Sequence, residues 1–421
     1  MQLRSPLLAT SLALAIASLA ACSSTQPPAA SAAPAPVAAA PAPAAAPITQ
    51  SNAAQAASAA YDFDMDVFHP VVGRSGMVAS EQELASRIGL QILKSGGNAV
   101  DAAVAMGFAL AVALPNAGNI GGGGFMVVHD AKSGKNIALD FREVAPSKAT
   151  RDMYVGADGK VIDGKSLYTH YAVGVPGTVA GMEHALKKWG SLPLSTVIAP
   201  AAKLADKGFT VSETLAKILE QEKKNMGQWP ATQAIFWRNG EPLKRGDRLV
   251  QKDLAQSLRL IGQQGSKVFY EGSIARKIAA EMAPHAGALS LQDLKSYKVA
   301  EREPLRGTYR GYEIVTMPPP SSGGAHLIQI LNMMERWPMN QWGVNSAQSI
   351  HYMAESMKLA YADRAEYLGD PDFVSVPLKG LTSKRYAEAL AAGIDPYQAR
   401  AGKDIRCLLY TSDAADDSLR V

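Results

Sequence analysis

Apolar positions near the start of the patterned part of the chain recur at the spacing of an amphipathic helix. Leu84, Ile88 and Ile92 predict one helical face, and a following pair of glycines ends the helix. Ser80, with Glu83 three residues later, has the pattern of a capping box and predicts the N-cap. A second helix is predicted from Asn98 to Leu114. Its many alanines predict a buried helix packed tightly against a sheet.

The next stretch alternates between apolar strands and turn residues. Phe125–Val128 and Ile137–Leu139 predict two strands joined by Asp130–Lys135, in which Gly134 supplies the turn. Four consecutive glycines, 121–124, precede the first strand and permit close approach to another chain segment or a ligand. From spacing alone, a strained turn at the sheet edge explains this run as well as a ligand-facing role does.

Further helices are predicted along the rest of the chain, including a long one from Ala347 to Tyr367, and a strand is predicted from Tyr309 to Met317. Helices and strands alternate without the regular rhythm of a doubly wound fold, and no repeat of fixed length occurs. These patterns favour a mixed α and β domain.

The first 60 residues have a different character. Residues 1–22 combine Arg4 with an apolar run and are typical of a secretion signal; the run is shorter than the roughly 20 residues of a membrane span. Its end, Leu19–Cys22, resembles the lipobox of bacterial lipoproteins, which predicts lipidation of Cys22; an ordinary signal peptide is the alternative. Residues 23–60 are almost only Ala, Pro, Ser and Gln and predict a disordered tether. We therefore expect a lipid-anchored protein on the periplasmic side of the cell envelope, with the outer membrane as the expected membrane.

Composition excludes several classes of protein. The net charge is +4, from 42 basic and 38 acidic residues, and no basic tract suggests a nucleic-acid partner. The two cysteines, Cys22 and Cys407, lie outside the patterned region, which excludes a disulfide framework.

Few residues carry chemistry that the sequence alone can assign. The seven histidines are scattered singly, so we expect no metal site, and no cofactor is expected either; they are His69, His129, His170, His184, His285, His326 and His351. The glycine run lacks the pattern of a phosphate loop and precedes a strand. Ser321–Ser322 favours a proline-fixed loop with a helix N-cap over a serine nucleophile. Arg142 offers a planar fork suited to a carboxylate, although a lone arginine is more often part of a structural ion pair.

Several motifs together resemble one family, the gamma-glutamyltranspeptidases (glutathione hydrolases). The order and spacing agree over about residues 66–406. The motifs are Leu139–Glu143 followed by Ala145–Pro146, Pro176–Gly181, Tyr309–Tyr312, Met317–Gly324 and Tyr361–Arg364.

The resemblance implies an α+β fold, the αββα four-layer sandwich of the N-terminal-nucleophile hydrolases. In that family a precursor cleaves itself into a large and a small subunit. The new N-terminal threonine of the small subunit attacks the gamma-glutamyl amide of glutathione or related compounds, with its own α-amine as base. Water, an amino acid or a dipeptide then accepts the glutamyl group. Arg142 matches the arginine that binds the α-carboxylate of the glutamyl group.

The chain departs from the family pattern after Arg406. We expect residues 61–406 to be the large-subunit region and residues 407–421 to be an unrelated tail, produced by a sequence artefact. Thr411 is followed by Ser412–Asp413 and does not fit the nucleophile. The fold would then be incomplete because the small subunit is missing, and no catalytic residue is assigned. We expect the chain to be inactive alone, with unpaired strand edges and exposed apolar surface.

Two alternatives stay open. One is a related N-terminal-nucleophile acylase of the cephalosporin or glutaryl type, in which Arg142 would bind an acidic acyl group. The other is a non-catalytic envelope lipoprotein that binds gamma-glutamyl compounds or a separately encoded small subunit.

Overall fold

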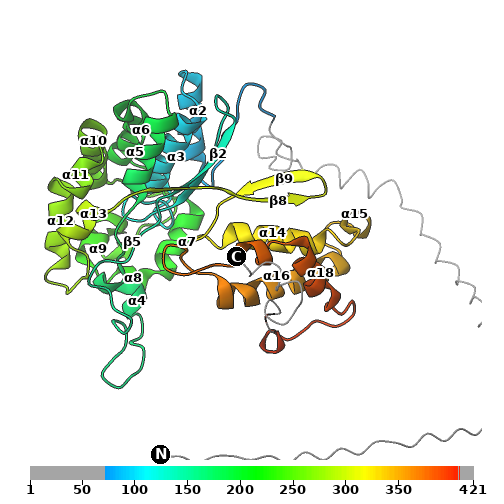
Figure 1. Ribbon diagram of the computed structural model, residues 1–421. Helices are drawn as coiled ribbons and strands as arrows, with labels where there is room; N and C mark the ends of the chain where they lie inside the picture. Colours follow the sequence, from blue (N-terminus) through cyan, green and yellow to red (C-terminus); the bar gives the residue numbers. More distant parts are fainter. Residues whose placement is uncertain (1–71, 406, 408–421) are drawn as a thin grey trace, which may run out of the picture. The chain divides into compact units, whose positions relative to one another are not determined.

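The structure is a computed structural model that describes residues 72–405 and 407. The predicted signal peptide with Cys22, the tether at 23–60 and all but the first residue of the predicted tail lie outside the described residues. Helices and short strands mix along the chain, which confirms the α+β class predicted from the sequence (Figure 1). In the described ranges, no helix is both long enough and apolar enough to cross a bilayer.

The first two helices are α2 (Glu83–Lys94) and α3 (Ala99–Ala113). The prediction that Ser80 caps α2 was wrong. The side chain of Gln82 accepts from the backbone N–H of Leu84, whereas the Ser80 hydroxyl donates to the carbonyl of Gln82, because the helix begins only at the third residue after the serine. At α3 a capping box does form, between Asn98 and Asp101.

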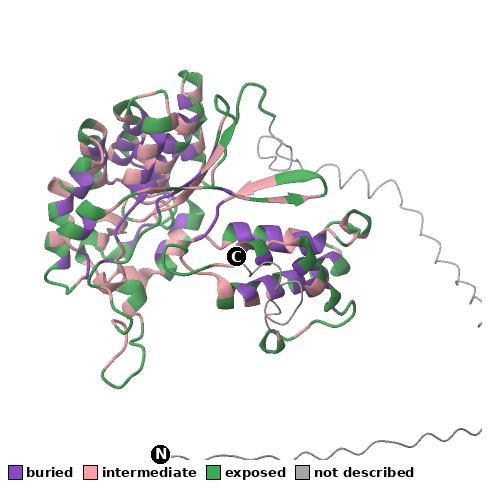
Figure 2. Cartoon of the chain, in the orientation of Figure 1, coloured by how far each residue is buried: buried purple, intermediate pink, exposed green. Residues whose placement is uncertain are grey.

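Helix α3 is buried along most of its length, as its alanine content predicted. Helices, more than the expected sheet, surround it. The main neighbours of α3 are the helices α2, α5 (Thr178–Trp189) and α6 (Leu194–Lys207), because small side chains let helix axes approach closely. This group of helices, together with α10 (Lys252–Gln264), surrounds the larger apolar core, seen as the buried segments in Figure 2.

A three-stranded antiparallel sheet has the order β1-β2-β7. Strands β1 (Phe125–Asp130) and β2 (Lys135–Asp140) form the predicted hairpin, and Gly134 occupies the turn with a φ of 68°. Strand β7 (Ala300–Arg302) pairs with the far end of β2, opposite Asp140 to Ala138. The middle strand β2 therefore carries its last three residues into the buried interior.

The segment between β2 and β7 is mostly helical. Its elements are α4 (Lys165–Tyr168), η2 (His170–Ala172), α5, α6, β3 (Phe209–Thr210), α7 (Glu213–Gln221), α8 (Lys223–Met226), α9 (Pro230–Phe236), β4 (Trp237–Arg238), β5 (Glu241–Pro242), β6 (Arg248–Leu249), α10 (Lys252–Gln264), α11 (Lys267–Tyr270), α12 (Ser273–Met282) and α13 (Leu291–Ser296). Helices are predicted along this part of the chain, and helices form there.

The last part of the chain begins with a second hairpin, β8 (Leu305–Tyr309) and β9 (Tyr312–Thr316). A single strand over Tyr309–Met317 was therefore wrong at its start, because Arg310 and Gly311 take positive φ values of 49° and 86° and reverse the chain. A second apolar core lies among the helices that follow. These are α14 (Gly323–Met334), α15 (Met339–Trp342), α16 (Ala347–Tyr367), α17 (Leu378–Leu381) and α18 (Lys384–Ala392), and η3 (Gly402–Asp404) comes after them.

Candidate functional site

The glycine run is pressed against the end of β2. Gly124 and Phe141 exchange two backbone hydrogen bonds of 3.2 and 3.0 Å, which extends the β1–β2 ladder by one pair. A Cβ on Gly123 would lie 2.5 Å from the carbonyl oxygen of Phe141 and 2.7 Å from the amide nitrogen of Glu143. Only glycine allows this approach. The run thus fixes the backbone on both sides of Arg142.

This backbone forms one wall of a cavity of about 990 Å³. The other walls come from β7, the loop before α14 and the end of α16. Three arginines line the cavity, and its charged and hydroxyl-bearing lining residues are Asp140, Arg142, Glu143, Tyr297, Lys298, Arg302, Ser321, Ser322, Arg364, Asp370 and Asp372. A cavity with several guanidinium groups is suited to an acidic small molecule.

Arg302 is already neutralised by two aspartates. Its Nε donates to Asp140 at 2.8 Å, and its two terminal nitrogens donate to both oxygens of Asp372 at 3.0 and 2.8 Å. The bidentate bond from Arg302 lowers the pKa of Asp372. Arg302 is therefore a structural clamp between β2, β7 and the segment after α16.

Arg142 is held differently. Its backbone N–H donates to Asp140 at 3.1 Å, and its carbonyl accepts from the Tyr297 hydroxyl at 2.9 Å, so the main chain is fixed on both sides. Its side chain is exposed and donates to the neutral carbonyl of Pro320 at 3.3 Å. Among residues 72–405 and 407, no carboxylate forms an ion pair with Arg142. The guanidinium charge is thus available to a ligand.

The loop before α14 brings Ser321 and Ser322 to the same cavity. Ser322 occupies the N-cap position of α14, but its side chain does not cap the helix. Its hydroxyl instead accepts from Nε of Arg364 at 3.1 Å, while the Ser321 hydroxyl accepts from the backbone of Gly323. The predicted loop and helix start are confirmed, and a capping role for the Ser322 side chain was wrong.

A buried polar cluster lies behind Arg364. The carboxyl of Asp363 accepts from Gln329 at 2.5 Å and from the Tyr386 hydroxyl at 3.0 Å, and burial raises its pKa. The thiol of Cys407 also contacts Asp363, and burial followed by the nearby carboxyl raises the pKa of this thiol to about 11. Burial, with a smaller effect of Arg364, lowers the pKa of His326. These contacts fix the rotation of α16 and hence the direction of Arg364.

Sequence reasoning singled out Arg142 and the Ser321–Ser322 loop, and the structure brings them to one cavity. It assigned no role to Arg302 or Arg364. Arg364 lay inside a recognised motif, but its contact with Ser322 joins residues 42 positions apart and could not be predicted from motif spacing. The structure also gathers His170 and His285 around Glu281, although the histidines were expected to lie singly. The separation of four residues between Glu281 and His285 was the available cue.

The fold is that of a known class of enzymes. The solved structures that share the fold are N-terminal-nucleophile hydrolases. The chain is a member of the gamma-glutamyltranspeptidase family, whose model matches residues 85–417. That match runs into the stretch after residue 406 that the sequence analysis set apart as a tail.

Individual relatives agree with this assignment. The chain is 51% identical over 355 residues to a glutathione hydrolase proenzyme of Escherichia coli strain K12, covering 84% of this chain and 61% of that protein. It is 40% identical over 338 residues to an acylase ACY 1 proenzyme of a Pseudomonas species, strain V22, covering 79% and 60%. The Helicobacter pylori gamma-glutamyltranspeptidase structure superposes with a TM-score of 0.78 at 46% identity, covering 81% of this chain and 97% of that one. The chain thus spans about three fifths of the length of the curated relatives.

Proposed function

We propose that this chain supplies the glutamate-binding part of an enzyme that cleaves the gamma-glutamyl amide of glutathione and related compounds. The enzyme would transfer the glutamyl group to water or to an amino acid or dipeptide. Membership of the gamma-glutamyltranspeptidase family supports this activity. One observation in the structure carries the proposal: Arg142 is positioned, exposed and without an acidic partner in the described part of the chain.

The chemistry of a gamma-glutamyl group fits this arginine. Its α-carboxylate is a planar anion that accepts two parallel hydrogen bonds from one guanidinium. Arg302 has no comparable freedom, since Asp140 and Asp372 already occupy its donors. Arg142 would therefore bind the α-carboxylate and leave the gamma carbonyl to extend into the cavity, where a nucleophile attacks it.

We further propose that the described region corresponds to the large subunit of a processed precursor. The Helicobacter pylori chain is matched over 97% of its length, whereas the Escherichia coli proenzyme is matched over 61%. The cavity lining within the described ranges contains two serines and no threonine. The threonine nucleophile, with its α-amine as base, would then come from a small subunit, and the 421-residue chain alone would be inactive.

Exposed apolar surface supports a protein partner of this kind. One face of α16 presents apolar side chains to solvent, whereas the other face is buried; the exposed ones are Ile350, Met353, Met357 and Tyr361. Within the described residues, β1 and β7 each have one unpaired edge. A small subunit that covers this helix face and pairs with an edge strand would bury both features.

Two measurements on the purified 421-residue chain test the proposal. We expect no release of aniline from a gamma-glutamyl anilide, and we expect saturable binding of L-glutamate or glutathione by calorimetry. Arg142→Ala should abolish that binding, whereas Arg306→Ala, which removes an exposed arginine paired with Glu313, should leave it unchanged. Turnover by the chain alone would refute its inactivity. Unchanged binding by Arg142→Ala would refute the role of the arginine.

An acylase of the glutaryl type is the second candidate, favoured by the 40% identity to the acylase ACY 1 proenzyme. A glutaryl group keeps the terminal carboxylate of a gamma-glutamyl group and lacks its α-amine. Arg142 suits either ligand, so competition between glutarate and L-glutamate separates the two functions. Tighter binding of L-glutamate supports the hydrolase, and equal or tighter binding of glutarate supports the acylase. The third possibility is a non-catalytic binding lipoprotein. It would be supported if Arg142→Ala abolished binding and if adding a small subunit produced no turnover.

The cell-envelope location is also a proposal. It rests on the lipobox-like end of residues 1–22, with Cys22 as the lipidated residue, and on the tether at 23–60, all outside the described residues. Incorporation of labelled palmitate that Cys22→Ser abolishes would support a lipid anchor. Equal labelling of both proteins, or none of the wild type, would contradict it.

A further inference from the structure

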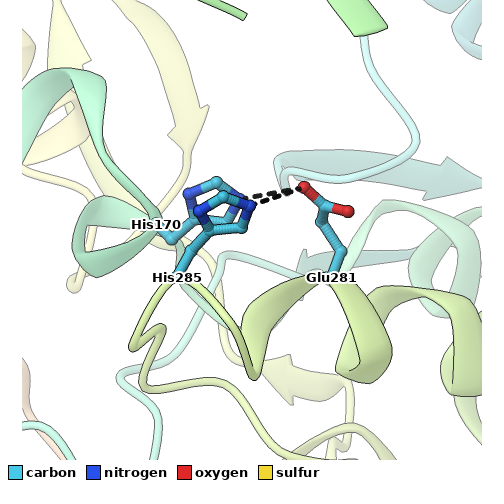
Figure 3. A group of neighbouring side chains, drawn as sticks. All are labelled: His170, Glu281 and His285. Carbon is cyan, nitrogen blue, oxygen red and sulfur yellow. Dashed lines mark hydrogen bonds and ion pairs between the residues drawn. The ribbon is translucent and has the colours of Figure 1, made fainter. Parts of the chain in front are cut away.

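Three side chains converge on the surface of the described domain, and none of them lines the arginine cavity. His170 comes from η2, Glu281 from the last turn of α12, and His285 from the turn that follows α12. Figure 3 shows both imidazole rings pointing toward the same carboxylate. Oε1 of Glu281 lies 3.4 Å from Nε2 of His170 and 3.5 Å from Nε2 of His285.

These distances are long for hydrogen bonds, which are most common near about 2.9 Å between nitrogen and oxygen. They suit ligands of one ion. Atoms bound tetrahedrally to zinc at about 2.0–2.2 Å lie roughly 3.3–3.6 Å from one another. All three potential ligand atoms lie within 4.8 Å of one another. The two nitrogen–oxygen distances are therefore compatible with ligands of one metal ion.

The two imidazole rings both face the Glu281 carboxylate. They stack with centroids 4.2 Å apart and planes 13° from parallel, so their Nε2 atoms lie on one side. Trp229 forms T-shaped contacts with both, with its ring centroid 5.1 Å from that of His170 and 6.1 Å from that of His285. Imidazole is a common metal ligand in proteins. The in-plane lone pairs of near-parallel rings do not converge, so binding of one ion requires the two rings to tilt toward each other.

The backbone positions the ligands as well. Glu281 and His285 are four residues apart, and the chain turns back after α12 because Gly287 donates to the carbonyl of Met282 at 2.9 Å. Thr169 accepts from the backbone of Tyr171 at 3.2 Å and caps η2, which fixes His170. The side chain of His170 is only 13% exposed, whereas that of Glu281 is 64% exposed. The site thus combines one fixed ligand with an exposed carboxylate.

We propose that His170, Glu281 and His285 bind a divalent transition metal of the zinc class. Two imidazoles and one carboxylate are a recognised zinc ligand set, whereas Mg²⁺ and Ca²⁺ prefer oxygen ligands throughout. With three protein ligands, a further coordination position is open to water. The ion would link η2 to α12 across 111 residues of sequence. This site is independent of the gamma-glutamyl activity proposed above.

Calorimetric titration of the metal-stripped 421-residue chain with zinc chloride tests the proposal. We expect one equivalent to bind, and we expect His285→Ala, His170→Ala and Glu281→Gln each to weaken binding about tenfold or more. His184→Ala is the matched control, because His184 forms a pair with Glu301 at 2.7 Å that lacks a second histidine. That variant should bind zinc as the wild type does.

Cobalt(II) supplies a second readout that does not depend on a variant. Bound at this site, it should give visible d–d bands without a thiolate charge-transfer band and should quench Trp229, which packs against both histidines. His285 is a surface residue, so His285→Ala is expected to fold, which circular dichroism verifies. The proposal would be overturned if the wild type bound no zinc or if the histidine variants bound zinc as tightly as the wild type. It would also be overturned if the cobalt spectrum showed a thiolate band that Cys22→Ser or Cys407→Ser removed.

Discussion

The guanidinium of Arg142 donates a hydrogen bond to the carbonyl oxygen of Pro320, 3.3 Å away. This contact connects the end of β2 with the loop before α14, which are 178 residues apart in sequence. Because the acceptor is neutral, the bond orients the fork without cancelling its charge. Donors that face the cavity stay available to a carboxylate.

Replacing Arg142 by lysine separates charge from geometry. Lysine keeps the positive charge and loses the planar fork, so two parallel bonds to a carboxylate are no longer possible. Hydrogen bonds to charged groups contribute about 1.5–3 kcal/mol, so we expect affinity for L-glutamate to fall by about tenfold or more. Calorimetry on Arg142→Lys and the wild type measures this difference. An unchanged affinity would show that the charge alone suffices.

The glycine run gives a prediction with an internal control. Gly123→Ala places a methyl group 2.5 Å from the carbonyl oxygen of Phe141, and the backbone cannot move without displacing Arg142. We expect a loss of about 1–3 kcal/mol in the free energy of unfolding. Gly121→Ala meets nothing within 4 Å and should change stability by less than about 1 kcal/mol. Urea unfolding of both variants tests this; equal effects would contradict the close approach.

Local patterns predicted much of the fold. The β1–β2 hairpin followed from apolar strands on either side of Gly134, and the long helix at Ala347–Tyr367 followed from its period. Helix starts were less predictable, because Ser80 and Gln82 both offer side-chain acceptors and only the final geometry selects one. The strand over Tyr309–Met317 was misjudged because the positive φ at Arg310 is unusual for a residue with a Cβ.

Residues of the cavity could be predicted from the sequence only where a single motif contains them. Arg142 could be singled out as a candidate because it follows a strand in a family motif, and the structure places it in the lining of the cavity. The difference between Arg142 and Arg302 could not be predicted, since it depends on where Asp140 and Asp372 lie in space, 162 and 70 residues from Arg302. The approach of His170 to Glu281 is likewise a property of tertiary packing.

Arg302 provides a stability prediction, because its two partners differ in exposure. Asp140 is 8% exposed and Asp372 is 59% exposed. Arg302→Met leaves the buried Asp140 carboxylate without its cation, and we expect a loss of about 2–4 kcal/mol in the free energy of unfolding. Asp372→Asn removes only the exposed partner and should lower it by about 1 kcal/mol or less. Denaturant unfolding measures both values, and a larger effect of Asp372→Asn would contradict this ranking.

Asp101 connects the start of α3 to the turn between α5 and α6. Its carboxylate is fully buried and accepts from the backbone N–H groups of Asn98, Ser191 and Leu192 at 2.8–3.1 Å, and from the Ser191 hydroxyl. Asp101→Ala leaves these donors buried without an acceptor. We expect it to reduce the free energy of unfolding by about 3 kcal/mol at neutral pH, whereas Asp158→Ala, in an exposed loop, should have little effect.

The contribution of Asp101 should also depend on pH. Burial acts to raise the pKa of its carboxyl, but the hydrogen bonds from Ser191, Asn98 and Leu192 outweigh burial and hold it below the usual value of 3.8. Between the folded and unfolded pKa values the unfolded chain binds more protons, so acid favours unfolding. The stability difference between wild type and Asp101→Ala should therefore be constant above about pH 5 and shrink as the pH falls below 3.8 toward the folded pKa. Urea unfolding of both proteins over that range measures it, and a difference that grows on acidification would show that the carboxylate is not stabilised by these donors.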